Sequence, residues 1–265
     1  MADNYTILVG TVGQGMNVSG DSGETWTKIR NPIPSECNIR ALRTYPDNPH
    51  RIIAGTDGLG LFRSDDNGVN WETIDSPIGD QQIWSVAVDP RDSETIFAGT
   101  RPEGFRSRDG GKSWDKLSMG VNKECPIGTP RTTNIVVDPR DSNTIWAGIE
   151  VDGVYKSLDG GDNWLQMPEL GPDPFHGDIH GMAVTEGGVY CTSPFGFATS
   201  RDEGKSWDIE RYYMNASPAY AGYSASCVLP PHLADGDPGM ILTVAGERAQ
   251  GHYPARAQAV RWRPL

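Results

Sequence analysis

The sequence has few basic residues and no long apolar run, and each absence excludes a class of protein. Its 265 residues contain 23 Lys and Arg against 35 Asp and Glu, which gives a formal net charge of −12. A chain this acidic repels nucleic-acid backbones and anionic membrane surfaces, and no run of Lys and Arg offsets that field. No apolar segment approaches membrane-spanning length. We therefore expect neither a nucleic acid nor a membrane as a partner.

Cysteine pairs and nucleotide-binding motifs are also missing. The four cysteines are far apart and show no CxxC spacing, which argues against zinc knuckles. No GxSxG elbow, phosphate-binding glycine loop or dinucleotide fingerprint occurs. The first five residues carry no basic stretch followed by an apolar run, so no signal peptide is visible. Reduced thiols without a leader favour a cytoplasmic protein, although a processed secreted form would look the same.

Glycine, proline and tryptophan are abundant instead, with 32, 20 and 8 residues. Five of the eight tryptophans come from a phrase of the form S-x-D-x-G-x-[S/T/N]-W that recurs five times. The five copies are Ser19–Trp26, Ser64–Trp71, Ser107–Trp114, Ser157–Trp164 and Ser200–Trp207. Successive tryptophans are 45, 43, 50 and 43 positions apart. A period near 40–45 residues with several strands per unit is typical of β-propellers.

Each unit has an upstream half made of two short apolar strands around a polar turn. Strand-like Ile83–Val88 is followed by an Asp-Pro turn and then by Thr95–Thr100. The unit therefore reads as strands A and B, a loop, strand C, the recurring phrase and strand D, which is one four-stranded antiparallel blade. Complete units are predicted at 39–74, 82–117, 132–167 and 179–210.

The two ends of the chain offer incomplete units. The first begins at strand B (Thr6–Gly10) and lacks strand A. The last offers strands at 224–229, 240–245 and 258–263 without the recurring phrase. We predict a single all-β propeller domain spanning 1–265, most simply with six blades, while five or seven stay open. Pairing between the chain ends would close the ring, because closure removes exposed sheet edges.

Every part of the recurring phrase has a structural role. The aspartate accepts backbone N–H bonds across the turn, the glycine allows a positive φ, and the tryptophan packs between blade layers. We interpret all five copies as hairpin fasteners rather than as binding sites.

The phrase, the Asp-Pro turn and the Ala-Gly-Thr end of strand B resemble the BNR/Asp-box superfamily of propellers. The resemblance covers nearly the whole chain. Its members include sialidases, xyloglucan-active glycoside hydrolases, sortilin-type receptor propellers and a photosystem II assembly factor, so it implies a fold and not a function. The Arg-Ile/Leu-Pro motif of sialidases is absent, and the chain has room for one propeller where the xyloglucan-active enzymes use two. No catalytic residue is carried over from either group.

A functional site is expected where the loops entering strand A meet those joining B to C, because this face varies while the fasteners repeat. The candidate substrate-binding residues on this face are basic or aromatic side chains: Arg40, Trp84, Arg101, Arg131, Tyr223, Phe195 and Arg248. Guanidinium groups bind carboxylates or phosphates, and aromatic rings stack on sugars. Alternatively, the arginines neutralise nearby acidic residues and the aromatic residues pack within or between blades.

The candidate catalytic residues are His180, Asp178, Glu150 and Glu247. Two carboxylates, or a carboxylate with a histidine, can serve as general acid and base in glycosidic cleavage. A divalent metal is the candidate cofactor, with His176, His180 and His252 as ligands, although their spacing matches no recognised metal motif. Solvated carboxylates and a hydrogen-bonded histidine are the competing interpretation.

The leading hypothesis is an enzyme that hydrolyses or eliminates a small polar substrate, carbohydrate-like or carboxylated, at the channel mouth. A metal-dependent hydrolase or lactonase is the second hypothesis. The third is a non-catalytic binding or assembly propeller. The oligomeric state and the substrate's identity do not follow from the sequence.

Overall fold

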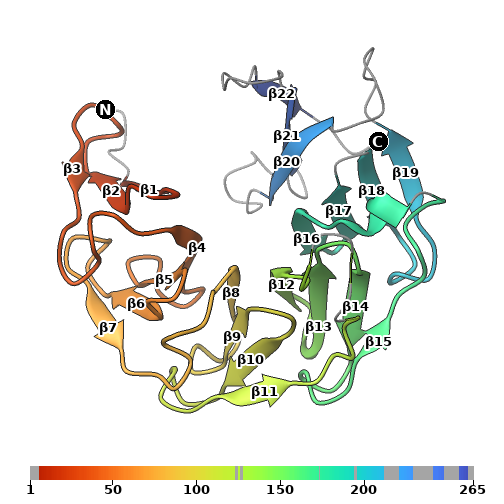
Figure 1. Cartoon of the computed structure of the whole chain (residues 1–265), viewed down its shortest axis with the longest axis horizontal. Helices are drawn as coiled ribbons and strands as arrows, with labels where there is room; N and C mark the ends of the chain where they lie inside the picture. The colour runs from red at the N-terminus through yellow and green to blue at the C-terminus, as the bar shows by residue number, and fades with distance from the viewer. Residues whose placement is uncertain are drawn as a thin grey trace. The chain divides into compact units, whose positions relative to one another are not determined.

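The computed structural model describes residues 6–122, 125, 128–172, 174–193, 196–211, 221–228, 241–247 and 257–261. Beyond residue 209 only the backbone is described. The chain divides into two compact units, Met1–Leu117 and Ser118–Leu265, and each is described by itself (Figure 1). The prediction of one domain over 1–265 stays a prediction.

The first unit contains three antiparallel sheets in chain order. A three-stranded sheet is followed by two four-stranded sheets. The strands of the first sheet are β1 (Ile7–Gly10), β2 (Met16–Ser19) and β3 (Thr27–Lys28). Those of the second are β4 (Ile39–Thr44), β5 (Ile52–Thr56), β6 (Leu61–Ser64) and β7 (Glu72–Ile74). Those of the third are β8 (Ser85–Val88), β9 (Ile96–Gly99), β10 (Gly104–Ser107) and β11 (Asp115–Leu117).

The second unit contains two four-stranded sheets and a three-stranded one. The first has β12 (Thr132–Asp138), β13 (Asp141–Ile149), β14 (Gly153–Ser157) and β15 (Leu165–Gln166). The second has β16 (Gly181–Thr185), β17 (Gly188–Ser193), β18 (Gly196–Ser200) and β19 (Asp208–Arg211), and the 3₁₀ turn η1 (Pro174–Gly177) precedes it. The third has β20 (Ala221–Val228), β21 (Ile241–Glu247) and β22 (Ala257–Arg261).

The all-β propeller class is confirmed. Each of the four complete repeat units forms one four-stranded antiparallel sheet, and the N-terminal sheet has three strands, as expected from its missing strand A. The last three strands occupy 221–228, 241–247 and 257–261, within three residues of the predicted bounds. No helix in the described part of the chain is long and apolar enough to cross a membrane.

The recurring phrases, here called Asp boxes, fasten the hairpins that join the third strand of a sheet to the fourth. In the third box the Ser107 hydroxyl donates to Asp109 at 2.8 Å and accepts from the Gly111 N–H at 2.8 Å. Asp109 also accepts from the backbone and hydroxyl of Ser113. These bonds hold the pKa of Asp109 at about 2, below its ordinary 3.8.

The glycine of every box has a positive φ, between 85° and 98°. A side chain there would be strained, and at Gly68 its Cβ would lie 2.7 Å from the Leu8 side chain of the preceding sheet. The box glycine therefore serves both the turn and the packing between sheets.

Three of the five box tryptophans pack between consecutive sheets of a unit, as the sequence predicts, whereas Trp26 of the first box is exposed. Trp71 joins a core that includes Met16 of the first sheet and Ile52 of the second. Trp114 lies against the core between the second and third sheets, and Trp207 against the core that includes Trp146. Burial of these rings and of the β-branched strand residues supplies the main stabilisation of each unit.

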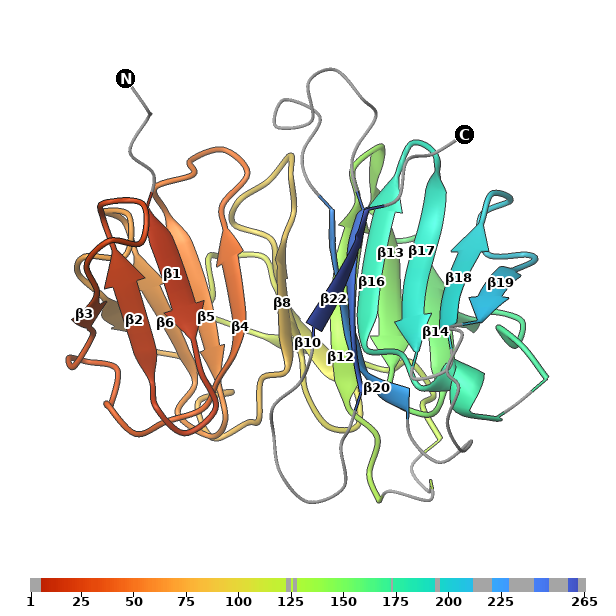
Figure 2. The ribbon, with the colours of Figure 1, turned by 90° about the horizontal axis from the view of Figure 1, so that it is seen from above.

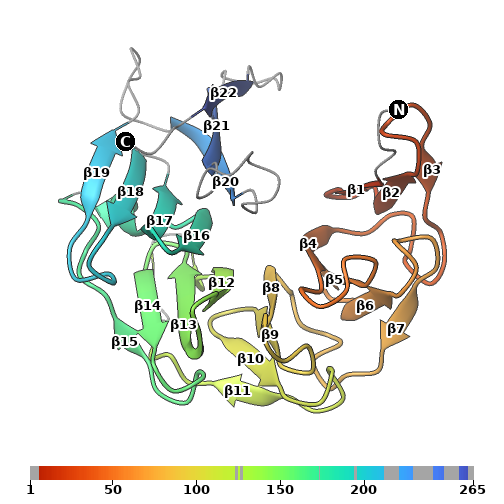
Figure 3. The same cartoon turned by 180° about the vertical axis from the view of Figure 1, so that it is seen from behind.

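The strand directions place the varied loops at one end of each sheet. Because consecutive strands are antiparallel, the start of the first strand lies at the same end as the connection from second to third; we call this the loop end. The Asp boxes lie at the opposite end, the box end. Figure 2 shows the strands of each unit running between two ends that carry connections. Within the units, β4 contacts β8 and β12 contacts β16 (Figure 3).

Candidate functional site

Three of the predicted substrate-binding residues meet at the loop end of the first unit. Two guanidinium groups approach the Trp84 ring: the Cζ of Arg40 is 4.2 Å and that of Arg101 is 5.6 Å from its centroid. Both distances are within the range of cation–π attraction, for which tryptophan is the best ring. We call Arg40, Trp84 and Arg101 the arginine–tryptophan cluster.

Neighbouring backbone contacts fix this cluster in place. Trp84 donates its backbone N–H to the Gly99 carbonyl at 2.8 Å, and Ile83 donates to the Thr56 carbonyl at 2.9 Å. These bonds dock the start of β8 on both its own sheet and the preceding one. The indole is therefore held by ladder hydrogen bonds on either side rather than by a free loop.

Arg40 is already paired within its own sheet. Its Nη2 lies 3.2 Å from Oδ2 of Asp57, the residue directly after β5. The same oxygen accepts from the Asn38 side chain at 3.1 Å. The side chains of Arg40 and Asp57 keep 22% and 17% of their surface exposed, so water still reaches the pair. Asp57 thus neutralises Arg40, while Arg101 is exposed and pairs with no carboxylate in the described part of the chain.

The second unit contains a more deeply buried ion pair, whose carboxylate follows the second strand as Asp57 does in the first unit. Arg131 and Glu150 form a bidentate pair between Nε and Nη2 of the guanidinium and both carboxylate oxygens. Glu150 directly follows β13, as Asp57 follows β5, and its side chain is only 3% exposed. The predicted substrate-binding residue Arg131 and the predicted catalytic residue Glu150 are therefore bound to each other.

The hairpin that follows β13 departs from the other repeats. At the matched position the other hairpins carry a hydroxyl that bonds a carbonyl across the turn, from Thr11, Thr56, Thr100 and Ser193. Ile149 stands there in this sheet. The carboxylate of Glu150 comes next, and then Val151 with φ of 65°, a conformation that costs a β-branched residue free energy.

The predicted catalytic residues His180 and Asp178 also meet. Nε2 of His180 lies 3.2 Å from Oδ2 of Asp178, and their side chains are 16% and 14% exposed. The intervening Ile179 donates its N–H to the Ile149 carbonyl at 3.4 Å. His180 directly follows Ile179, and Glu150 directly follows Ile149. The hydrogen bond between Ile179 and Ile149 therefore brings His180 and Glu150 to the same loop end.

The metal hypothesis receives no support from the described residues, among which no group of three or more His, Cys, Asp and Glu is placed to hold an ion. His176 is buried beneath the chain at Gly171. His252, Phe195 and Arg248 lie outside the described residues. For Glu247, the last residue of β21, and for Tyr223 within β20, only the backbone is described.

Three free cysteines lie in the described part of the chain, and two of them are buried. These cysteines are Cys37, Cys125 and Cys191. Burial raises the pKa of the Cys37 and Cys191 thiols, which keeps them protonated and poor nucleophiles at neutral pH.

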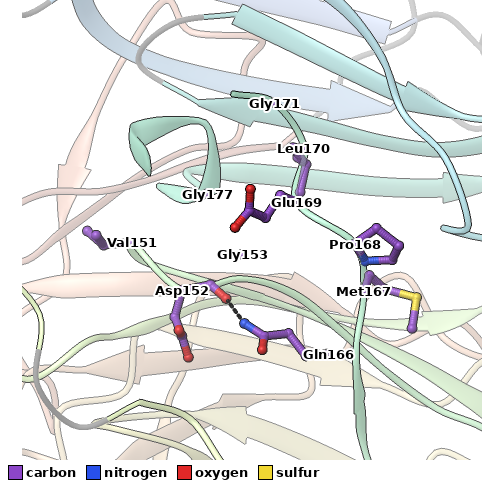
Figure 4. A pocket seen from close by; sticks show the side chains of 10 residues that line it. All are labelled: Val151, Asp152, Gly153, Gln166, Met167, Pro168, Glu169, Leu170, Gly171 and Gly177. Carbon is purple, nitrogen blue, oxygen red and sulfur yellow. Dashed lines mark hydrogen bonds between the residues drawn. The ribbon is translucent and has the colours of Figure 1, made fainter. Parts of the chain in front are cut away.

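The structure adds a pocket that the sequence analysis did not predict. It has a volume of about 400 Å³ and lies in the second unit, at the loop end of the β12–β15 sheet. Its lining residues are Val151, Asp152, Gly153, Gln166, Met167, Pro168, Glu169, Leu170, Gly171 and Gly177 (Figure 4). One feature of the sequence marks this place: two other repeats end their second strand with Ala-Gly-Thr, whereas this repeat ends it with Ala-Gly-Ile at Ile149.

Comparisons with known proteins agree with this architecture. Residues 59–171 match the model of the family described as sortilin, neurotensin receptor 3 (Sortilin-Vps10). A solved structure of YCF48 from Cyanidioschyzon merolae has a TM-score of 0.56 at 15% identity, covering 87% of this chain and 73% of that one. The family match covers less than half of this chain and the structural likeness has 15% identity, so the comparisons show a β-propeller fold with a likeness to sortilin-type propellers.

A second similar structure is the extracellular domain of the putative one component system BT4673 from B. thetaiotaomicron. Its TM-score is 0.61 at 13% identity, and the match covers all of this propeller chain but only 40% of that chain. Both likenesses are far below 25% identity, so they establish the fold alone. A search of curated proteins finds no match.

Proposed function

We propose that this Asp-box propeller binds a small polar ligand carrying a carboxylate, such as an acidic sugar, at the arginine–tryptophan cluster. The observation that supports the proposal is that Arg101 is exposed and has no carboxylate partner among the described residues. Its guanidinium lies 5.6 Å from the Trp84 ring centroid.

The charges of the cluster favour an anion. The cluster has two guanidinium groups and one carboxylate beside them, and this carboxylate, of Asp57, pairs with Arg40 and not with Arg101. One positive charge is thereby left at the loop end of an otherwise acidic chain. A planar guanidinium binds a carboxylate through two parallel hydrogen bonds, and stacking on Trp84 pre-orients the Arg101 group for that geometry.

Isothermal titration calorimetry on the full chain tests this function. Glucuronate and N-acetylneuraminate are titrated beside neutral glucose and galactose. We expect the acids to bind and the neutral sugars to bind at least about tenfold more weakly, because a hydrogen bond to a charged group contributes about 1.5–3 kcal/mol.

Arg101→Ala should abolish the preference for acids. Arg108→Ala is the matched control, because Arg108 is an exposed arginine at the box end of the same sheet, with 53% of its side chain accessible. Equal loss in both variants, or equal binding of acids and neutral sugars, would disprove the proposal.

A second candidate function is acid–base catalysis in the second unit, and the His180–Asp178 pair favours it. A carboxylate bonded to one imidazole nitrogen orients the ring and supports proton transfer at the other. This candidate depends on His180 and Asp178, since Arg131 already engages both oxygens of Glu150. Hydrolysis or elimination of acidic glycosides is the expected chemistry.

The catalytic candidate is tested with aryl glycosides of acidic sugars. His180→Ala should abolish turnover while the melting temperature and ligand binding at the arginine–tryptophan cluster stay unchanged. Unchanged turnover in His180→Ala, or no turnover in the unmodified chain, contradicts catalysis and leaves a binding propeller.

A further inference from the structure

The pocket of the second unit is built where two segments leave the repeat pattern. One wall is the hairpin after β13, in which Ile149 replaces the usual hydroxyl residue and Val151 has a φ of 65°. The other wall is the connection from β15 to η1, which contributes Met167 through Gly171. Strained backbone persists where the surrounding structure holds it, and such positions gather at ligand sites.

Close packing makes the floor of this pocket rigid. Leu170 is buried, and a Cβ at Gly171 would lie 2.6 Å from the Ile209 side chain and 2.9 Å from the His176 ring. Only a glycine fits between these groups. The chain on this wall therefore has no room to move inward and fill the space.

Hydrogen bonds fix the opposite wall as well. The Gln166 side chain donates to the Asp152 carbonyl at 2.9 Å, which ties β15 to the hairpin (Figure 4). The Asp152 carboxylate accepts from the Asn122 N–H at 2.9 Å and from the Tyr155 hydroxyl at 2.7 Å. Asp152 is thus held in one orientation, and its carboxylate charge is met by neutral donors alone among the described residues.

Glu169 differs from Asp152 because no group in the described part of the chain bonds its carboxylate. Figure 4 shows this carboxylate turned toward the space between Gly177 and Gly153. None of the ten lining residues is a lysine or an arginine. Two negative charges accordingly border the pocket without a lining cation, while Val151, Met167, Pro168 and Leu170 supply apolar surface.

We infer that this pocket binds a ligand with an ammonium or guanidinium head on an apolar stem. The head is placed at the Glu169 carboxylate, and the stem contacts Met167 and its apolar neighbours. The volume of about 400 Å³ falls within the range of small-molecule sites. Such a group occurs both in free alkylamines and in the basic side chains of peptides. The inference is independent of the arginine–tryptophan cluster, which lies in the other unit and carries the opposite charge.

Titration of the full chain with four probes tests the inference by calorimetry. Cadaverine and agmatine represent free amines and guanidines, whereas N-acetyl-lysine amide and N-acetyl-arginine amide represent peptide side chains. N-acetyl-norleucine amide is the neutral control of similar shape. We expect the cationic probes to bind, with an affinity that falls as salt rises, and the neutral probe to bind at least about tenfold more weakly.

The variant Glu169→Gln removes the charge without removing any hydrogen bond or ion pair among the described residues, and it should weaken binding of the cationic probes about tenfold or more. Glu186→Gln is the matched control, because Glu186 is an exposed glutamate in the β16–β17 turn, outside the pocket. Asp152→Asn keeps an acceptor for Asn122 and Tyr155 and should also weaken binding.

The outcomes separate cleanly. Preference for agmatine and cadaverine over the two amides identifies a free amine as the ligand, and the reverse identifies a peptide side chain. The inference is overturned if Glu169→Gln binds like the unmodified chain, if the neutral probe binds equally, or if no cationic probe binds at millimolar concentration. Acidic-sugar binding in Glu169→Gln reports on the proposed function separately and should be unchanged.

Discussion

The two units place a carboxylate at the same position of a sheet, yet its guanidinium partner comes from a different position in each. Arg40 lies within β4, whereas Arg131 directly precedes β12. Asp57 and Glu150 both follow the last residue of a second strand. Asp57 is 17% exposed and has Asn38 as a second donor, whereas Glu150 is 3% exposed and bonds only Arg131 among the described side chains. The repeat therefore fixes the position of the carboxylate, and the neighbouring residues determine its partner and how far water reaches it.

Removing the guanidinium from the buried pair should have the largest effect. Arg131→Met leaves the Glu150 carboxylate buried without a partner, and we expect a loss of about 3–5 kcal/mol in the free energy of unfolding. Denaturant unfolding measures it. Adding Glu150→Gln to the variant should recover much of the loss. A cost below about 1 kcal/mol for Arg131→Met would mean that water reaches Glu150.

The same change in the less buried pair should cost less. Arg40→Met leaves Asp57 with the Asn38 donor and with water, so the expected loss is about 1 kcal/mol or less. Denaturant unfolding under identical conditions provides the comparison. A loss equal to that of Arg131→Met would show that the two pairs play the same structural part.

The smallest difference between units is expected at the Asp boxes. The Ser113 hydroxyl and backbone N–H donate hydrogen bonds to the Asp109 carboxylate, and these bonds hold the pKa of Asp109 at about 2. Hydrogen bonds from the backbone and side chain of Asn163 do the same for Asp159. A lowered folded-state pKa stabilises the fold above the ordinary value of 3.8, and this contribution is lost as the pH falls toward about 2.

Asp109→Asn and Asp159→Asn should each flatten the dependence of unfolding free energy on pH between about 4 and 2, and to a similar degree. Chemical denaturation at a series of pH values measures both slopes. Different slopes in the two variants would show that the boxes are not equivalent fasteners.

Much of the fold could be predicted because its signals are local. The box hydrogen bonds join residues at most four positions apart, and strand patterning fixes the sheets between them. The bounds of the β4–β7 sheet, 39 to 74, match the predicted unit. Strand patterns at the chain end are less regular and lack a box, so those bounds differ by up to three residues.

The site could be predicted only in part. Loop position identified Arg40, Trp84, Arg131 and Glu150, but not which of them would pair, because pairing depends on side-chain reach between loops. The pocket was missed because its walls are largely backbone and apolar side chains, from Val151 and from Met167 to Gly171, with no repeated counterpart. A break in the repeat at Ile149 was the sole sequence cue.

The Trp26 side chain of the first box is 47% exposed, while Trp71 of the second is 8% exposed. Both boxes close the same local bonds, including indole N–H to glycine carbonyl at 3.0 and 2.9 Å. The hydrogen bonds of a box therefore form within one sheet, and only the burial of its tryptophan depends on the neighbouring sheet. Tandem duplication of one repeat would add a sheet without requiring a new type of turn, so this architecture is easy to extend. The loops of each added repeat can then change independently of the others.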